Sequence, residues 1–196
     1  MASVNEPADS AGIRPDVWQA YLDTPEHMVA EILGGELHVM PRPRPRHANV
    51  AGRLRGRLRG FDDPDEGEPG GWVILVEPEL HLSPVDRPVV PDLAGWRLER
   101  VDDGFLDPAA IAIAPDWVCE ILSDSTRGID RVKKQRIYHT AEVSHVWHID
   151  PDAQTLEVFR RDGERWTLLQ SAVGDEHVRA DPFADVELDL ARFWKV

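Results

Sequence analysis

The chain contains 196 residues, of which 42% are hydrophobic and 30% are charged. This length and composition are typical of one globular domain with its own core, so we expect a flexible tail at residues 1–12 and a single domain over residues 13–196. No apolar run approaches the ~20 residues that a membrane helix requires, and no signal peptide is predicted. The single cysteine, Cys119, excludes an internal disulfide and favours a reducing, cytoplasmic location.

The net charge of −14 argues against a protein that binds nucleic acid through its overall charge. The basic residues are nevertheless concentrated in two segments: residues 42–59 contain seven arginines and no acid, and residues 127–136 contain five basic residues and one acid. A local basic face on an acidic protein can bind a polyanion, whereas the alternative is a solvated helix surface. The residues predicted to contact nucleic acid are Arg42, Arg44, Arg46, His47, Arg53, Arg57, Arg127 and Arg131.

Helix and strand signals alternate along the chain and predict a mixed α/β layer architecture. Pro15 is typical of a helix start, Gly34-Gly35 of a tight hairpin turn, and the polar residues 123–126 of a helix cap. In chain order we expect a helix at 15–22, a hairpin of strands 28–33 and 36–40, a helix at 47–60, strands at 72–82, 89–98 and 116–122, a helix at 128–140, strands at 143–149, 155–160 and 164–170, and a short helix at 188–194.

Two carboxylates fall on strands that are otherwise apolar. Strand alternation puts Glu120 on the same face as Val118 and Leu122, and a lone carboxylate there is costly unless it is protonated, paired or bound to a metal. Asp92 follows Pro91, which places its strand at an edge or in a bulge. The alternatives are a glutamate paired with an arginine and a turn-forming aspartate. Together, the two carboxylates predict an oxygen-rich site suited to Mg²⁺ or Mn²⁺.

Three further residues are candidates for the same site. Lys134 lies about two turns into the helix that follows the Glu120 strand, where it would stabilise charge on a phosphate; the alternative is a surface ion pair with Asp130. Glu31, with apolar neighbours on both faces, fits either a third metal ligand or a structural ion pair with an arginine. His47 fits a residue that supports the metal ligands, a phosphate contact or an ordinary residue at a helix start.

These residues belong to an ordered series of short motifs that runs from about residue 15 to residue 194. The motifs are Glu31 before Gly35-Glu36-Leu37, Met40-Pro41, His47, Val90-Pro91-Asp92-Leu93, Glu120-Ile121-Leu122-Ser123, Ser125-Thr126-Arg127, Asp130-Arg131, Lys134 through Tyr138, and Val146-Trp147-His148-Ile149-Asp150-Pro151. As a set, they resemble the Uma-two-type restriction endonuclease family, which is placed in the PD-(D/E)XK nuclease superfamily.

The resemblance implies an α/β (α+β) restriction-endonuclease-like fold, with a central mixed sheet flanked by helices after an N-terminal helix and β-hairpin. It also implies a Mg²⁺- or Mn²⁺-dependent endodeoxyribonuclease centre in which Asp92 and Glu120 are metal ligands. The superfamily lysine follows the glutamate by two residues, but that position is Leu122 here. In this family the lysine is displaced to the following helix, so Asp92, Glu120 and Lys134 are the predicted catalytic residues, and Asp92, Glu120 and Glu31 the predicted metal ligands.

Two hypotheses follow from these residues. In the first, the protein is an enzyme that hydrolyses DNA phosphodiester bonds, and the family resemblance favours a homodimer without an organic cofactor or a membrane. In the second, it is an inactive nuclease-fold module that binds nucleic acid or a protein partner, as the net charge of −14 favours. A zinc site at His145 and His148 is excluded, because residues three apart on a strand point to opposite faces.

Overall fold

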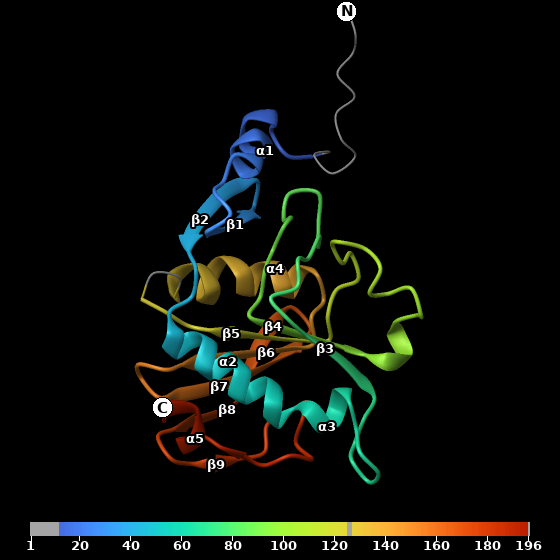
Figure 1. The fold of residues 1–196 in the computed structure, drawn as a ribbon, viewed down its shortest axis with the longest axis vertical. Coiled ribbons are helices and arrows are strands. Elements are labelled where there is room, and N and C mark those ends of the chain that lie inside the picture. Colours follow the sequence, from blue (N-terminus) through green and yellow to red (C-terminus); the bar gives the residue numbers. More distant parts are fainter. Residues whose placement is uncertain (1–11, 125–126, 196) are drawn as a thin grey trace, which may run out of the picture.

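The computed structural model describes residues 12–124 and 127–195, so the predicted tail falls outside the described residues except for Gly12. Its centre is a six-stranded sheet of order β3-β4-β5-β6-β7-β8 (Figure 1). Only β5 and β6 are parallel, and every other neighbouring pair is antiparallel. The strands are β3 (Trp72–Val76), β4 (Leu93–Arg97), β5 (Trp117–Ile121), β6 (His145–Asp150), β7 (Thr155–Asp162) and β8 (Arg165–Val173). This mixed sheet confirms the predicted fold class.

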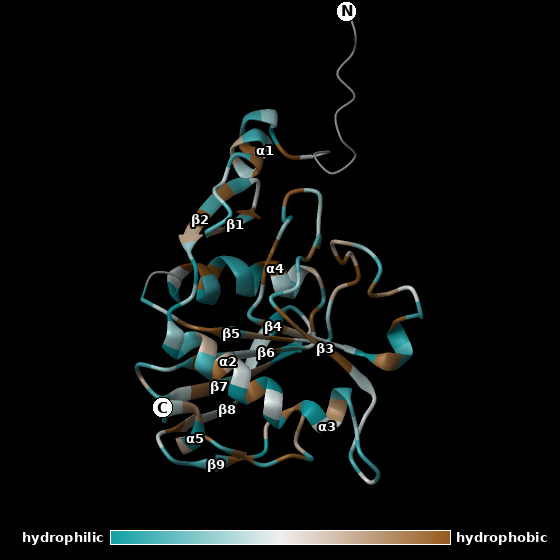
Figure 2. Cartoon of the chain, viewed as in Figure 1, coloured by the Kyte–Doolittle hydropathy of each residue, from teal (hydrophilic) through white to brown (hydrophobic). Residues whose placement is uncertain are grey.

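Helices cover both faces of the sheet, because the central strands are apolar on both sides (Figure 2). One face packs against α2 (Pro45–Arg57), α3 (Arg59–Asp62) and α5 (Ala191–Trp194), and its core contains Trp117 and Trp147. The other face packs against α4 (Gln135–Thr140), and its core contains Val118 and Tyr138. Trp117 and Val118 therefore belong to different cores, as the alternation of side chains along a strand requires.

The N-terminal elements form a separate layer above the sheet (Figure 1). Helix α1 (Pro15–Leu22) packs on the hairpin of β1 (Met28–Leu33) and β2 (Glu36–Pro41). Gly34 and Gly35 turn the hairpin with φ angles of 62° and 75°, values that glycine adopts without strain. The hairpin is joined to the body by the Ile32 N–H, which donates to the Pro88 carbonyl at 3.0 Å.

Several predicted boundaries were wrong. The predicted strand 72–82 ends at Val76, since Glu77 adopts a φ of 47°, and the strand predicted at 89–98 begins at Leu93. The predicted helix 128–140 contains a wider π-helical turn, η3 (Ile129–Lys134), before α4. The predicted helix 188–194 is a short strand followed by α5. The remaining elements are the 3₁₀ turn η2 (Leu98–Arg100) and the strand pair β9 (His177–Val178) and β10 (Leu188–Asp189).

None of the helices in the described part of the chain combines the length and the apolarity that crossing a membrane requires.

Candidate functional site

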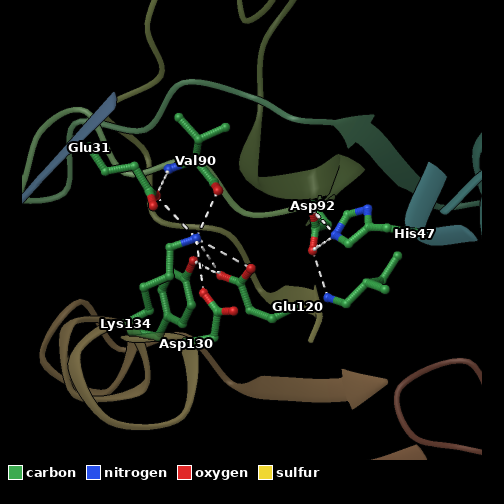
Figure 3. A network of polar contacts seen from close by, with 9 residues as sticks. Glu31, His47, Val90, Asp92, Glu120, Asp130 and Lys134 are labelled. Atoms are coloured by element: carbon green, nitrogen blue, oxygen red, sulfur yellow. Dashed lines mark hydrogen bonds and ion pairs between the residues drawn. The ribbon is translucent and has the colours of Figure 1, made fainter. Parts of the chain in front are cut away.

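The predicted catalytic residues line one cleft of about 640 Å³ at the junction of the hairpin layer, the sheet and helix α2. Asp92, Glu120 and Lys134 all lie on its surface, together with Glu31 and His47 (Figure 3). This cleft is called the site cleft below. It brings together residues from β1, α2, β5, η3 and the segment before β4, so the structure places all five predicted residues in one region.

Glu120 lies near the end of the fully buried strand β5, with 2% of its surface exposed. The Lys134 Nζ lies 3.1 Å from Glu120 Oε1 and donates a hydrogen bond to Oε2 at 3.3 Å. The hydroxyl of Tyr138, which is also fully buried, donates to Oε1 at 2.5 Å. A lysine and a tyrosine therefore take the place of the arginine partner that was considered for Glu120 from the sequence.

Lys134 is enclosed rather than exposed, since only 3% of its surface reaches solvent. Besides Glu120, its ammonium group lies 3.1 Å from Glu31 Oε1 and 3.7 Å from Asp130 Oδ1, and it donates to the Val90 carbonyl at 2.9 Å. The sequence-based alternative, an ion pair of Lys134 with Asp130 on the surface, is therefore wrong about exposure. The pair with Asp130 exists, but it is buried within a larger cluster that we call the lysine cluster: Glu31, Glu120, Asp130, Lys134 and Tyr138.

The lysine cluster contains three carboxylates and one ammonium group. Burial alone would lower the pKa of Lys134, but the charges of Glu120 and Glu31 raise it well above its usual range, so the ammonium stays charged. Burial raises the pKa of Glu120, Lys134 opposes this rise, and Asp130, Asp92 and Glu31 add to it. Burial and the neighbouring Glu120 also raise the pKa of the Tyr138 hydroxyl. Lys134 thus opposes the rise in the pKa of Glu120 without cancelling it.

Asp92 lies beside the lysine cluster, immediately before β4 rather than within a strand as predicted. Its Oδ2 accepts a hydrogen bond of 2.6 Å from the backbone N–H of Ile121, the residue that follows Glu120. Its Oδ1 lies 3.0 Å from His47 Nε2, which comes from the first turn of α2. These contacts fix the Asp92 carboxylate on the cleft wall next to the end of β5.

His47 is held by this contact with Asp92. Burial alone would lower the pKa of His47, whereas the hydrogen bond and the charge of Asp92 outweigh burial and raise it, with a smaller contribution from Glu77. Of the roles considered for His47 from the sequence, the geometry favours support of the candidate metal ligand Asp92, because the imidazole is directed at its carboxylate (Figure 3). Contact with phosphate stays a prediction.

The donor set of the cleft fits a hard cation bound through few protein ligands. Asp92 and Glu120 provide carboxylate oxygens on one wall, and no cysteine lines the cleft among the described residues. Within residues 12–124 and 127–195, no group of three or more His, Cys, Asp or Glu residues is arranged to hold a metal ion. Mg²⁺ is commonly bound through only one or two carboxylates, with water and substrate phosphate as its remaining ligands. The residues present therefore fit Mg²⁺ rather than a metal held wholly by protein.

Glu31 lies on the far side of Lys134 from Asp92 (Figure 3). Its Oε1 accepts a hydrogen bond of 2.7 Å from the Val90 N–H and also faces Lys134. Its Oε2 is buried and has no hydrogen-bond partner among the described residues. Glu31 thus serves as a partner of the lysine, and its predicted role as a third metal ligand stays a prediction.

The predicted nucleic-acid contacts divide into two groups. Arg42, Arg44 and Arg46 line the site cleft with His47. Arg42 donates to the Glu26 carbonyl at 3.1 Å and Arg46 pairs with Asp152 at 3.0 Å, whereas the side chain of Arg44 makes no hydrogen bond or ion pair within the described part of the chain. The other four arginines are not part of the cleft lining and are held by neighbours. Their contacts are Arg53 with Asn49 at 3.0 Å, Arg57 with the Glu187 carbonyl at 2.7 Å, Arg127 with Asp150 at 3.0 Å and Arg131 with Glu157 at 2.7 Å.

Sequence reasoning assigned no role in the site to Tyr138, and it considered Asp130 only as a surface partner of Lys134. Tyr138 follows Lys134 by four residues, a spacing that puts both side chains on one helix face. That spacing was a usable signal for Tyr138. The Val90 carbonyl could not be found in this way, because a backbone group leaves no mark in the sequence.

A mixed sheet with helices on both faces, and a carboxylate–lysine cluster at its edge, defines a restriction-endonuclease-like protein. The model of the Uma2 family, described as "Putative restriction endonuclease", matches residues 18–191, and the chain belongs to this family. Among solved structures, it is similar to a "putative nuclease belonging to DUF820" from Anabaena variabilis, with 21% identity, a TM-score of 0.71, and coverage of 92% of this chain and 98% of the other. No curated protein matches the chain.

Proposed function

We propose that the protein is a Mg²⁺- or Mn²⁺-dependent endonuclease that hydrolyses phosphodiester bonds in DNA. The observation that carries the proposal is the pair Asp92 and Glu120, two carboxylates that line one cleft, together with the raised pKa of Glu120, which burial raises despite the opposing charge of Lys134. A divalent cation bound there would lower the raised pKa of Glu120. Membership of a nuclease family supports the same chemistry.

Asp92 and Glu120 would hold the cation. When bound, a divalent cation activates water and stabilises charge on a phosphate. The Ile121 N–H and His47 keep the Asp92 carboxylate oriented toward the cleft. Lys134 keeps Glu120 in place and supplies a positive charge, because Glu120 and Glu31 raise the pKa of its ammonium group.

The substrate backbone would enter along Arg44 and Arg46. These side chains are exposed and line the cleft; that of Arg46 pairs with the exposed Asp152, and that of Arg44 has no partner within the described residues. Guanidinium groups bind phosphate oxygens through paired hydrogen bonds, which position a nucleic acid without reading its sequence. The overall charge of −14 then limits binding to this local basic wall.

One observation favours the alternative of an inactive binding module. Both oxygens of Glu120 already contact Lys134, and Tyr138 donates to one of them, so the buried cluster is hydrogen-bonded without a metal. In that case Asp92 and Glu120 would be structural, and the cleft would bind nucleic acid or a protein partner without turning it over.

Cleavage assays and calorimetry separate the two functions. Supercoiled and linear DNA would be incubated with the wild type, Asp92→Asn and Glu120→Gln in Mg²⁺, Mn²⁺ or EDTA, and Mg²⁺ binding measured by titration. Glu187→Gln, at an exposed position outside the site cleft, is the matched control. The endonuclease requires metal binding and cleavage by the wild type and the control, with both lost in the two site variants. DNA binding without metal binding or cleavage would establish the inactive module.

A further inference from the structure

A second hollow of about 730 Å³ adjoins the site cleft and is called the side hollow below. Both are bordered by Asp92 and Val90 from the segment before β4, and by Arg42 and Pro43 from the link between β2 and α2. The candidate metal ligand Asp92 therefore lies where the two spaces meet. If the reacting phosphate of a substrate lies at Asp92, a substituent next to that phosphate can reach into the side hollow.

The side hollow combines an aromatic ring with acidic groups. Tyr21, Leu22 and Met28 provide its apolar lining, and Glu77 and Glu79 provide carboxylates. Burial and the charge of Glu79 raise the pKa of Tyr21, which agrees with a tyrosine hydroxyl close to the Glu79 carboxylate. Because carboxylates only accept hydrogen bonds when ionised, this lining suits a flat ligand that carries hydrogen-bond donors.

Glu77 is held at the junction by an unusual backbone conformation. Its φ of 47° lies in the left-handed region. Residues other than glycine, asparagine and aspartate seldom adopt this conformation. The Glu77 N–H donates to the Asp92 carbonyl at 3.0 Å, so the strained residue is fixed to the peptide of the candidate metal ligand. Such strain persists where the surrounding structure imposes it, often at functional sites.

The two spaces differ in the cations that line them. Arg42, Arg44, Arg46 and Lys134 line the site cleft beside its carboxylates, whereas among the described residues Arg42 is the only lysine or arginine that lines the side hollow, together with Glu26, Glu77 and Glu79. Phosphate groups are attracted to the arginines of the site cleft and repelled by the carboxylates of the side hollow. A strand bound at Asp92 is therefore oriented with its backbone along the arginines, which leaves an uncharged nucleobase for the side hollow.

We propose that the side hollow binds the nucleobase next to the phosphate at Asp92, and that it favours bases with an exocyclic amino group over thymine. This inference rests on the proposed nucleic-acid substrate. Adenine, cytosine and guanine present amino donors to Glu77 and Glu79, and thymine has none. The Tyr21 ring supplies a stacking surface. Because a base reaches the hollow only when it is unstacked, the substrate would be single-stranded, frayed or locally opened.

The test measures the affinity of fluorescent single-base oligodeoxynucleotides by anisotropy in EDTA, which separates binding from cleavage. We expect oligomers of adenine or cytosine to bind about tenfold more tightly than oligomers of thymine, as one hydrogen bond to a charged group allows. Glu77→Gln and Glu79→Gln should reduce this preference and leave thymine binding unchanged. The control, Glu99→Gln, lies on the exposed turn η2 outside the hollow and should behave as wild type.

Tyr21→Leu should weaken all base-containing oligomers about tenfold but leave an abasic oligomer unaffected, because only stacking is lost. Arg44→Gln should weaken every oligomer equally, the abasic one included. Equal affinities for all bases, or a preference that survives both Glu77→Gln and Glu79→Gln, would overturn the inference. Since these measurements contain no metal, loss of cleavage alone would refute the proposed nuclease without touching the base preference. Glu77→Gln, at an exposed side chain, avoids the folding risk that Tyr21→Leu carries.

Discussion

Two groups of cations border the same cleft and are held in opposite ways. Lys134 is 3% exposed and contacts three carboxylates and a carbonyl group. Arg44 is exposed, and its side chain makes no hydrogen bond or ion pair within the described residues. A buried charge must be compensated locally, so the partners of Lys134 are fixed by folding, whereas Arg44 remains available to a ligand. Partners and burial, rather than charge alone, therefore decide what each cation does.

The largest effect is expected from removing the buried charge. Lys134→Met leaves Glu31 and Glu120 buried without their ammonium partner, and should lower the free energy of unfolding by about 3–5 kcal/mol. Urea denaturation without metal at neutral pH measures this change. The neighbouring Lys133→Met is a matched control, because Lys133 forms an exposed pair with Glu36 and should cost at most about 1 kcal/mol. Equal losses in both variants would contradict the comparison.

A smaller loss should follow from removing one hydroxyl group of the lysine cluster. Tyr138→Phe deletes the hydrogen bond to Glu120 and should lower the free energy of unfolding by about 1.5–3 kcal/mol. The other tyrosine provides the control, since the Tyr21 hydroxyl makes no hydrogen bond within the described part of the chain. Thermal and urea unfolding of Tyr138→Phe and Tyr21→Phe would show the difference. If Tyr138→Phe is as stable as the wild type, the hydrogen bond from Tyr138 to Glu120 does not contribute to stability.

The next prediction concerns His148, a buried base on strand β6. Burial, with the charge of Arg131, lowers the pKa of His148 from 6.5 to about 4. The unfolded chain therefore takes up this proton before the folded one, and stability is lost as pH falls from 6.5 toward 4. From about pH 7.5 to about pH 5 the loss should be about 2 kcal/mol.

Urea denaturation at several pH values would detect this loss. His148→Leu should remove that part of the pH dependence, whereas the exposed control His27→Leu should retain it. An identical pH dependence in His148→Leu and the wild type would contradict the assignment.

The smallest effect is expected from changing the exposed cation, Arg44. Arg44→Gln should reduce the salt dependence of DNA binding by about one unit of slope, since one phosphate contact is lost, with little change in stability. The control Arg59→Gln removes an arginine that is already paired with Asp65 at 2.9 Å and should leave the slope unchanged. Anisotropy titrations at increasing salt compare the two. Equal slopes for both variants would show that the cleft arginines have no special role.

The arginines of residues 42–59 show what the sequence could predict about nucleic-acid contacts and what it could not. The seven arginines of residues 42–59 form one signal in the sequence, and the structure separates them by position. Those before α2 and at its start line the cleft, while Arg55 pairs with Asp62 and Arg59 with Asp65. Asp62 is the last residue of α3 and Asp65 lies in the loop after it, and spacing alone does not say which acids of this part of the chain pair with arginines. The prediction for Arg53 and Arg57 therefore has no support from the cleft geometry.

The candidate site was predicted as a set of residues but not as an arrangement. Asp92, Glu120 and Lys134 stood out because charged groups in apolar runs require compensation, and all three line one cleft. No pattern in the sequence indicated that Lys134 would contact Glu31, which lies in a distant hairpin, or that Asp92 would accept a hydrogen bond from the Ile121 N–H. The convergence of Asp92 and Glu120 on one metal ion stays a prediction.

Local chemistry in the sequence determined the start of α1 at Pro15, the turn at Gly34-Gly35 and the burial of strand β5, because backbone preference and apolar patterning act over a few residues. The tertiary structure alone decided which carboxylates share Lys134 and which arginines remain unpaired. Those choices depend on contacts between segments far apart in the chain, and their energies come from burial and from the partners that folding brings within hydrogen-bond distance.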